Sequence, residues 1–327
     1  MTELARSTGQ RSRSRRALRS AAADVLFRNV TRAAALLVLA LVVAILVVLV
    51  VQAWPALHRF GWHFFSGREW DPAHATFSAL TSIFGTLVTS AIAMVIAVPV
   101  SFGIALFITE LAPAWLRRPV STAVELLAAI PSIIYGMWGL FVFAPLFGEY
   151  VQPWIIEHLG SWPWVGVLFQ GPPMGIGIFT AGLILAIMVI PFISAVMRDV
   201  FSLVPTVLRE SAYGVGCTTW EVVWRVVLPY TRVGVMGGIM LGLGRALGET
   251  MAVTFVIGNS HTLGASLFNA GNTISSTLAN EFTEAVGQIY TSSLIALGLI
   301  LFLITFVVLA LAKLLLLRMA AREGSPT

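Results

Sequence analysis

The sequence predicts an all-α integral membrane protein with six transmembrane helices, and three observations lead to this fold class. Of its 327 residues, 58% are hydrophobic and only 11% are charged, whereas a soluble protein carries about 25% charged residues. The chain contains six long apolar runs, and about 20 apolar residues cross a bilayer as a helix. Its Lys and Arg residues gather in alternate segments between these runs, as the positive-inside rule expects of a multi-pass protein.

The apolar runs place the helices near residues 33–51, 78–108, 120–143, 176–197, 233–257 and 293–317. The first run carries no charge and exceeds the roughly 7–15 apolar residues of a secretory signal peptide, so we expect an uncleaved anchor. The chain then divides into a basic N-terminal tail (1–32), an anchor helix (33–53), an extracytoplasmic loop (54–77), a core of five helices (78–318) and a C-terminal tail (319–327).

The positions of Lys and Arg orient these helices. With the N-terminus inside, the tail holds eight of the 20 basic residues and the other inner segments hold nine, whereas the outer segments hold only Arg59 and Arg68. Positive charge gathers on the cytoplasmic side of a membrane protein. We therefore expect both termini in the cytoplasm. The basic tail is interpreted as a disordered segment that fixes topology, and no nucleic-acid partner is expected.

Several kinds of chemistry are excluded by composition. Cys217 is the only cysteine, so no internal disulfide can form. The five histidines are scattered without metal-ligand spacing, so no metal site is expected. Lys313 is the only lysine and does not follow glycine, so the chain has no phosphate-binding loop for ATP. We expect no catalytic site and no cofactor bound by this chain.

The inner segment 198–232 is too long for a simple connection and carries signals for two short helices. Pro205 is suited to open the first, and Gly214 and Gly216 to end it or turn the chain. Thr218 and Glu221 form a possible capping box for the second.

The second short helix has an amphipathic pattern. The helical spacing of its apolar residues predicts one apolar face, formed by Trp220, Val223, Trp224 and Val227. Glu221 and Arg225 form an i, i+4 pair, and Pro229 is expected to stop the helix. Such a helix either anchors the loop at the membrane surface or docks into a groove of a cytoplasmic partner.

This segment also carries a spaced motif. Its residues are Glu210, Ser211, Ala212 and, after three residues, Gly216, followed after nine residues by Val226, Val227, Leu228 and Pro229. The motif resembles the E-A-A-x-x-x-G loop, with its later I-x-L-P, of the permease subunits of ABC importers. Ser replaces the second family residue and Val the isoleucine. The resemblance implies a type I ABC importer permease fold, in which this loop is the coupling element that seats on a separate ATP-hydrolysing subunit.

Three further stretches narrow the resemblance. "AAIPSIIYGMWGLFVF" (128–143), "GLGRALGETMAVTFVIGN" (242–259) and "LANEFTEA" (278–285) are similar to the PstC-type permeases of phosphate-specific transport (Pst) systems. The sister PstA type usually lacks the "ETMAV" continuation. The resemblance implies a bacterial inner-membrane complex with a PstA-type permease, two ATPase subunits that bind ATP and Mg, and an extracytoplasmic phosphate-binding protein.

The expected function is therefore translocation of inorganic phosphate into the cell, driven by ATP that a partner hydrolyses. Three alternatives remain open at this stage: a permease for another oxyanion such as molybdate or sulfate, the PstA-type sister subunit, and an ion channel with an Arg–Glu gate. A channel would conduct without an ATPase and would not need the coupling loop. An integral-membrane enzyme is disfavoured because no cluster of catalytic residue types lies at one depth.

Arg245 and Glu249 lie in the fifth apolar run, where each charge costs about 2.5–3.5 kcal/mol to insert. They are four residues apart, so on one helix they share a face and can pair. A guanidinium also offers planar, bidentate donors to phosphate oxygens. We expect Arg245 to contact the anion in the transport path, with Glu249 as its counter-charge.

Prolines and glycines predict how the helices bend and pack. Pro99, Pro131 and Pro191 fall within the second, third and fourth runs, where they are expected to kink the helices as fixed bends or hinges. The i, i+4 glycines of the fifth run, Gly234, Gly238 and Gly242, are expected to let another helix approach closely.

Overall fold

The computed structural model describes residues 2–163 and 166–323, with side chains from 24 to 318, and is helical throughout apart from its loops. The only β pairing in this part of the chain is an isolated bridge between Asp71 and Thr76. The chain forms two compact units, Met1–Gln52 and Ala53–Thr327. Residues 324–327 of the predicted C-terminal tail lie outside the described residues.

Six helices of the described chain are long and apolar enough to cross a membrane, which confirms the predicted number. Their bounds are Asp24–Phe60, Leu80–Leu111, Ser132–Leu159, Ile178–Ser202, Thr219–Leu247 and Gln288–Arg318. The first, second, fourth and sixth overlap the predicted runs closely. The third and fifth differ in ways that bear on function.

The first unit consists of helix α1 (Thr2–Phe60) as far as Gln52. Residues 2–32, expected to be a disordered tail, continue the same helix in the structure. The side chains from 24 to 51 are almost all exposed, including a long series of Leu, Val and Ile residues. A helix that is apolar on all sides and covered by nothing else is suited to surrounding lipid.

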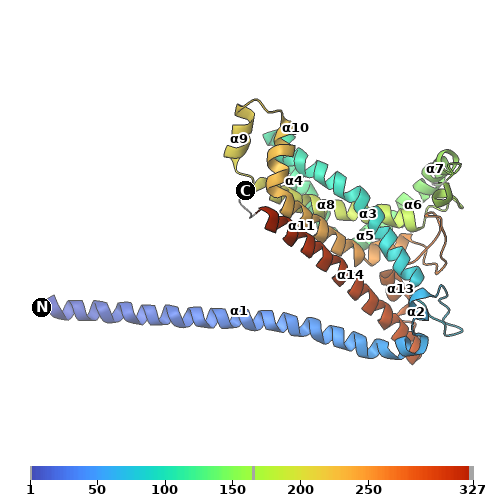
Figure 1. Cartoon of the computed structure of the whole chain (residues 1–327), viewed down its shortest axis with the longest axis horizontal. Helices are drawn as coiled ribbons and strands as arrows, with labels where there is room; N and C mark the ends of the chain where they lie inside the picture. The colour runs from blue at the N-terminus through green and yellow to red at the C-terminus, as the bar shows by residue number, and fades with distance from the viewer. Residues whose placement is uncertain (1, 164–165, 324–327) are drawn as a thin grey trace. The chain divides into compact units, whose positions relative to one another are not determined.

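The second unit is built around α3 (Leu80–Leu106) and α8 (Ile178–Ser202), which pack together more extensively than any other helix pair in it. Pro99 and Pro191 lie inside these two helices, as predicted. Around α8 pack α4 (Ala114–Ala128), α11 (Leu228–Leu247) and the short α12 (Met251–Val256), and α11 also packs against α14 (Gln288–Glu323) (Figure 1).

The glycine series of α11 faces α8, as the i, i+4 spacing predicts. A Cβ added at Gly234 would lie 2.5 Å from a Val200 side-chain carbon, and one at Gly242 would lie 2.5 Å from the side chain of Ile193. A Cβ at Gly238 would lie 3.1 Å from Val196. The absence of side chains on this stripe therefore allows the two helices to approach closely.

The third span corrects the prediction. Residues 120–143 do not form one helix, because α4 ends at Ala128 and a new helix begins at Ser132. The new helix runs through α5 (Ser132–Trp138), η2 (Gly139–Phe143), α6 (Ala144–Leu146), η3 (Phe147–Val151) and α7 (Gln152–Leu159). Pro131 stands at the N-cap position of α5 and is not a hinge inside a helix. It lacks an N–H and cannot continue α4, so the chain restarts there.

The fifth span also differs, at both of its ends. It begins at Thr219 and runs through α10 (Thr219–Val222), η5 (Val223–Val227) and α11 to Leu247. The prediction that Pro229 stops a short helix is therefore wrong. In the π-helical turn η5 the Leu228 N–H bonds to the Val223 carbonyl, five residues back. This wider turn accommodates the proline ring just after it.

The remaining elements lie at the two ends of the second unit. Helix α9 (Thr206–Gly214) lies with α10 at one end, which we call the α9 end (Figure 1). Helices α2 (His63–Ser66), α7 and α13 (Ile274–Glu281) lie at the opposite end, which we call the α13 end (Figure 1). The π-helix η1 (Phe107–Leu111) continues α3, and the 3-10 helix η4 (Gly166–Phe169) follows α7.

Candidate functional site

The motif segment at the α9 end folds as its local signals predict. Pro205 stands at the N-cap of α9, which ends at Gly214. Gly216 has a φ of +90°, a left-handed conformation that other residues rarely adopt. Its N–H bonds to the Tyr213 carbonyl at 2.9 Å, and the Cys217 N–H bonds to the Ala212 carbonyl at 3.1 Å. The glycine is required here for its backbone conformation, since a Cβ would meet nothing within 4 Å.

The predicted capping box of the next helix is present. The Thr218 N–H donates to Glu221 Oε2 at 2.9 Å, and the Glu221 N–H donates to Thr218 Oγ1 at 3.4 Å. Arg225 Nη1 lies 3.9 Å from Glu221 Oε1, so the predicted i, i+4 pair also forms. These contacts fix the start of the long helix that leads into the fifth span.

The predicted apolar face of this helix is divided between the core and the surface. Val227 is buried in the main core of the second unit and Val223 is also buried, whereas Trp220 and Trp224 are exposed. The two indole rings lie 5.2 Å apart, so they form an aromatic pair on the surface of the α9 end.

The motif residues differ in exposure. Glu210, Ser211 and Gly216 are exposed, and Ala212 packs partly against the core. Of the second half of the motif, Val227 is buried, Val226 and Leu228 are partly buried, and Pro229 is exposed. The structure therefore brings both halves to the same end of the unit, with Glu210 facing outward.

Two ion pairs that the sequence did not indicate lie at this end. Arg209 Nη2 is 3.1 Å from Glu110 Oε1, and Arg198 Nη1 is 2.8 Å from Glu125 Oε1. Arg198 also contacts its neighbour Asp199 at 2.8 Å. In the sequence, Glu110 is distinguished only as a charged residue at the edge of an apolar run, and that position does not identify its ion-pair partner.

Arg245 and Glu249 lie on either side of a break in the helix. Helix α11 ends at Leu247 and α12 begins at Met251, so the two residues are not on one helix face, in contrast to the expectation. Glu249 Oε1 accepts a hydrogen bond from the Ala252 N–H at 3.3 Å, at the start of α12. Within the described part of the chain, no ion pair joins Arg245 to Glu249 or to any other carboxylate.

Arg245 instead has an aromatic neighbour and an open side. Its Cζ atom lies 5.6 Å from the centre of the Phe192 ring on α8, and the residue is exposed on this chain. Non-helical backbone at membrane depth is tolerated only where it is buried in protein or lines a water-filled cavity. The break thus places beside irregular backbone a guanidinium that has no carboxylate partner in the part of the chain that the structure describes.

A second polar cluster lies at the α13 end, and sequence reasoning missed it. Glu281 accepts hydrogen bonds from Trp70 Nε1 at 2.7 Å and from the Tyr290 hydroxyl at 2.8 Å, both on Oε2. His261 Nε2 lies 2.8 Å from the other oxygen, Oε1, and its ring stacks on Trp70 with centroids 5.5 Å apart. These residues come from four separate segments, two loops and the helices α13 and α14, so their spacing in the sequence gave no signal.

The cluster sets the protonation of Glu281. Burial raises the pKa of this carboxyl, but the hydrogen bonds from His261, Tyr290 and Trp70 outweigh burial and hold its pKa below the ordinary value of 4.5. Asn272 supports the imidazole, with its Nδ2 2.7 Å from His261 Nδ1. The carboxylate is therefore a fixed negative charge that joins the loops of Trp70 and His261 to α13 and α14.

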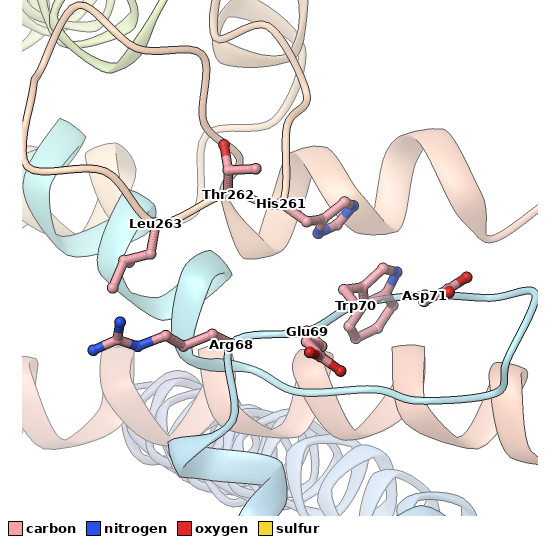
Figure 2. Close-up of a pocket in the computed structure, with 7 residues that line it drawn as sticks. All are labelled: Arg68, Glu69, Trp70, Asp71, His261, Thr262 and Leu263. Carbon is pink, nitrogen blue, oxygen red and sulfur yellow. The ribbon is translucent and has the colours of Figure 1, made fainter.

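A pocket of about 610 Å³ opens beside this cluster. Figure 2 shows its two sides, Arg68–Asp71 on one loop and His261–Leu263 on another, with Trp70 and His261 close together. Its charged lining is mixed in sign. No group of three or more His, Cys, Asp or Glu in the described residues is placed to hold a metal ion.

Comparison with known proteins gives consistent matches. Residues 97–321 match the family described as binding-protein-dependent transport system inner membrane component. A phosphate transport system permease protein PstC from Pasteurella multocida is 60% identical over 301 residues, which cover 92% of this chain and 94% of the relative. The protein of the same name from Mesorhizobium japonicum is 59% identical over 307 residues, covering 94% of each.

Solved structures agree on the fold. A bacterial ABC transporter involved in the import of the acidic polysaccharide alginate has a TM-score of 0.53 at 18% identity, over 90% of this chain and 98% of that one. An alginate ABC transporter in complex with its pentasaccharide-bound periplasmic protein has a TM-score of 0.52 at 19% identity, over 80% of this chain and 85% of that one. At this identity the likeness concerns the fold alone.

Proposed function

Because the chain belongs to the family of binding-protein-dependent transport system inner membrane components, we propose that it is the membrane-spanning permease of an ATP-driven importer of inorganic phosphate. The observation that carries this proposal is the 60% identity to a phosphate transport permease over 92% of the chain. Permeases of other oxyanions, the sister subunit and a channel find no comparable support.

The α9 end is proposed to face the cytoplasm and to dock on the ATPase subunits. Exposed Glu210, the left-handed turn at Gly216 and the surface pair of Trp220 and Trp224 together offer a protruding contact surface. The positive-inside distribution supports this orientation. ATP and Mg would be bound by two copies of that partner, because this chain lacks a phosphate-binding loop.

The other partners follow from the same proposal. A PstA-type permease would complete the membrane-spanning pair, and an extracytoplasmic phosphate-binding protein would deliver the anion at the α13 end. Both termini would be cytoplasmic, in a bacterial inner membrane. A cysteine at exposed Ser161, in a Cys217→Ser background, should react with an impermeant thiol reagent added outside intact cells. Protection of that cysteine, together with labelling of Cys217 in the wild-type chain, would reverse the orientation.

Arg245 is proposed as the anion contact of the transport path. Its exposure and the absence of a carboxylate partner among the described residues leave its donors available to phosphate oxygens. Glu249, expected as a direct counter-charge, is bonded to the Ala252 N–H instead. Its proposed part is to hold the break beside Arg245 and to keep a negative charge near the path, so that the anion is released.

Helices α3 and α8 are proposed to bend at Pro99 and Pro191 as the path opens alternately to the two sides. Uptake of labelled phosphate tests the proposal as a whole. Proteoliposomes that contain the complete complex, binding protein and internal ATP should accumulate phosphate, and excess molybdate or sulfate should not compete. Accumulation without ATP would indicate a channel, and preference for molybdate or sulfate would change the substrate.

A further inference from the structure

Helix α9 packs against α10 and η5 at the start of the fifth span, and one side chain joins it to α3 and α8. None of the nine residues Thr206–Gly214 is buried, so the helix has no core face of its own. Its apolar contribution to the main core is the partly buried Ala212. A helix this loosely packed needs a further contact if its displacement is also to move α3 and α8.

Arg209 provides that contact and reaches two elements at once. Its Nη2 atom donates a hydrogen bond of 2.6 Å to the Phe201 carbonyl, at the end of α8. The same atom lies 3.1 Å from Glu110 Oε1, in the π-helix η1 that continues α3. Helices α3 and α8 are the most extensively packed helix pair of the unit, and Arg209 joins α9 to both of them.

The ion pair is buried to an extent that stability alone does not explain. The Glu110 side chain is 5% exposed and that of Arg209 is 18% exposed, whereas Glu125 is 57% exposed in its pair with Arg198. Apart from the ion pair itself, Glu110 Oε1 and Arg209 Nε have no hydrogen-bond partner among the described residues. Removing two charges from water costs about as much as their attraction returns, so apolar residues would hold the helices equally well. The pair is better suited to fixing one geometry than to adding stability.

The surroundings of the pair leave room for a change of geometry. An apolar pocket of about 260 Å³ lies beside Glu110, lined by Leu106, Glu110, Leu111, Thr219, Trp220 and Val223. Two π-helical turns, η1 and η5, border it. Such turns have a hydrogen-bond register that can shift by one residue, and they are frequent at functional sites.

We propose that Glu110 and Arg209 are positioning residues that transmit displacement of α9 to α3 and α8, and so couple ATP hydrolysis to opening of the transport path. This inference rests on the proposed function, since it requires an ATPase that moves α9. Glu110 contacts neither ATP nor phosphate in this mechanism. It acts only by holding the guanidinium that joins the three elements.

The test compares Glu110→Gln with Glu125→Gln in the complete transporter. The second variant is the matched control, because it removes a carboxylate from an exposed arginine pair at the same end of the unit. Phosphate moved per ATP hydrolysed is measured in proteoliposomes, together with the amount of ATPase subunit that co-purifies. Glu110→Gln should lower the ratio by about tenfold, within the roughly 5–150-fold range of typical couplings between sites. Its ATPase subunits should still co-purify, and Glu125→Gln should keep the normal ratio.

Two further variants keep the inference falsifiable if Glu110→Gln fails to assemble. Arg209→Lys retains the charge but not the planar fork, so we expect a ratio between those of wild type and Glu110→Gln. The exchanged pair Glu110→Arg with Arg209→Glu should recover part of the ratio. A normal ratio in Glu110→Gln or Arg209→Lys would overturn the inference, as would loss of the ATPase subunits from Glu110→Gln complexes. Absence of phosphate transport by the wild-type complex would instead refute the proposed function.

Discussion

Replacing Arg245 by Gln removes the positive charge near the end of α11 while keeping a polar side chain. The guanidinium makes no ion pair with a carboxylate within 4.0 Å in the described chain, and its ring contact with Phe192 is 5.6 Å long. A cation–π contact at an exposed site is worth about 0.5–1 kcal/mol. The substitution should therefore cost the fold little.

The cost should fall on the transported anion. A hydrogen bond to a charged group contributes about 1.5–3 kcal/mol, and every 1.4 kcal/mol is roughly a factor of ten. Loss of one such contact predicts that Arg245→Gln lowers phosphate uptake by about 10–150-fold. Arg245→Lys keeps the charge and loses the bidentate geometry, so its phosphate uptake should lie between that of wild type and that of Arg245→Gln.

The assay is the initial rate of labelled phosphate uptake into proteoliposomes with binding protein and ATP, normalised to the complex recovered. Uptake by Arg245→Gln within about twofold of wild type would refute the anion contact, since that difference is below 0.5 kcal/mol. Failure of this variant to assemble would show that the residue is structural. A normal rate in the double variant Arg245→Leu, Glu249→Leu would refute a transport role for both charges.

Three further predictions test other parts of the structure. Gly216→Ala should cost about 1–2 kcal/mol through its positive φ and reduce stimulation of the ATPase, whereas Gly216→Asn should be tolerated; equal stimulation by both would contradict this. Gly242→Ala places a Cβ 2.5 Å from the Ile193 side chain and should lower the Tm of the purified complex by an overpacking cost of about 1–3 kcal/mol. Gly237→Ala on the same helix meets nothing within 4 Å and should leave the Tm unchanged or higher; a matching loss in both would refute the packing argument. Because the folded pKa of Glu281 is lowered, its contribution to stability is present above the ordinary pKa of 4.5 and is lost as pH falls through the folded value. The Tm of wild type should therefore fall on acidification more than that of Glu281→Gln, and identical pH profiles would count against the cluster.

The parts of the fold that the sequence predicted correctly depend on local signals. The number of spans follows from the length and hydropathy of single segments. The start of α9 at Pro205, the turn at Gly216 and the capping box at Thr218 each depend on residues within a few positions. Physical preferences of this kind act in the same way whatever the rest of the chain does, so they can be predicted without tertiary structure.

The candidate site was predictable only in part, because many of its contacts join residues that are far apart in the sequence. The motif residues were found because they are close in sequence, although the helix that follows them continues past Pro229 into the membrane span. Glu110 lies 99 residues from Arg209, and Trp70 lies 211 residues from Glu281. Contacts at such separations depend on how the helices pack, and one sequence contains no periodicity that reports them.

The break between Arg245 and Glu249 shows why a local prediction failed at the central residue pair. The segment around it favours helix, since a single glycine costs only about 1 kcal/mol relative to alanine.

The packing that accompanies the break depends on a different part of the chain. At Gly136 on α5 a Cβ would lie 2.8 Å from Phe255 and 3.0 Å from the Met251 carbonyl, and at Gly139 on η2 it would lie 3.0 Å from Val256. These two glycines leave room for α12 to pack directly against the third span. Burial of Ala252, Val253 and Val256 in that contact offsets the lost helical hydrogen bonds. The position of Arg245 at a helix end is therefore determined by residues more than a hundred positions earlier.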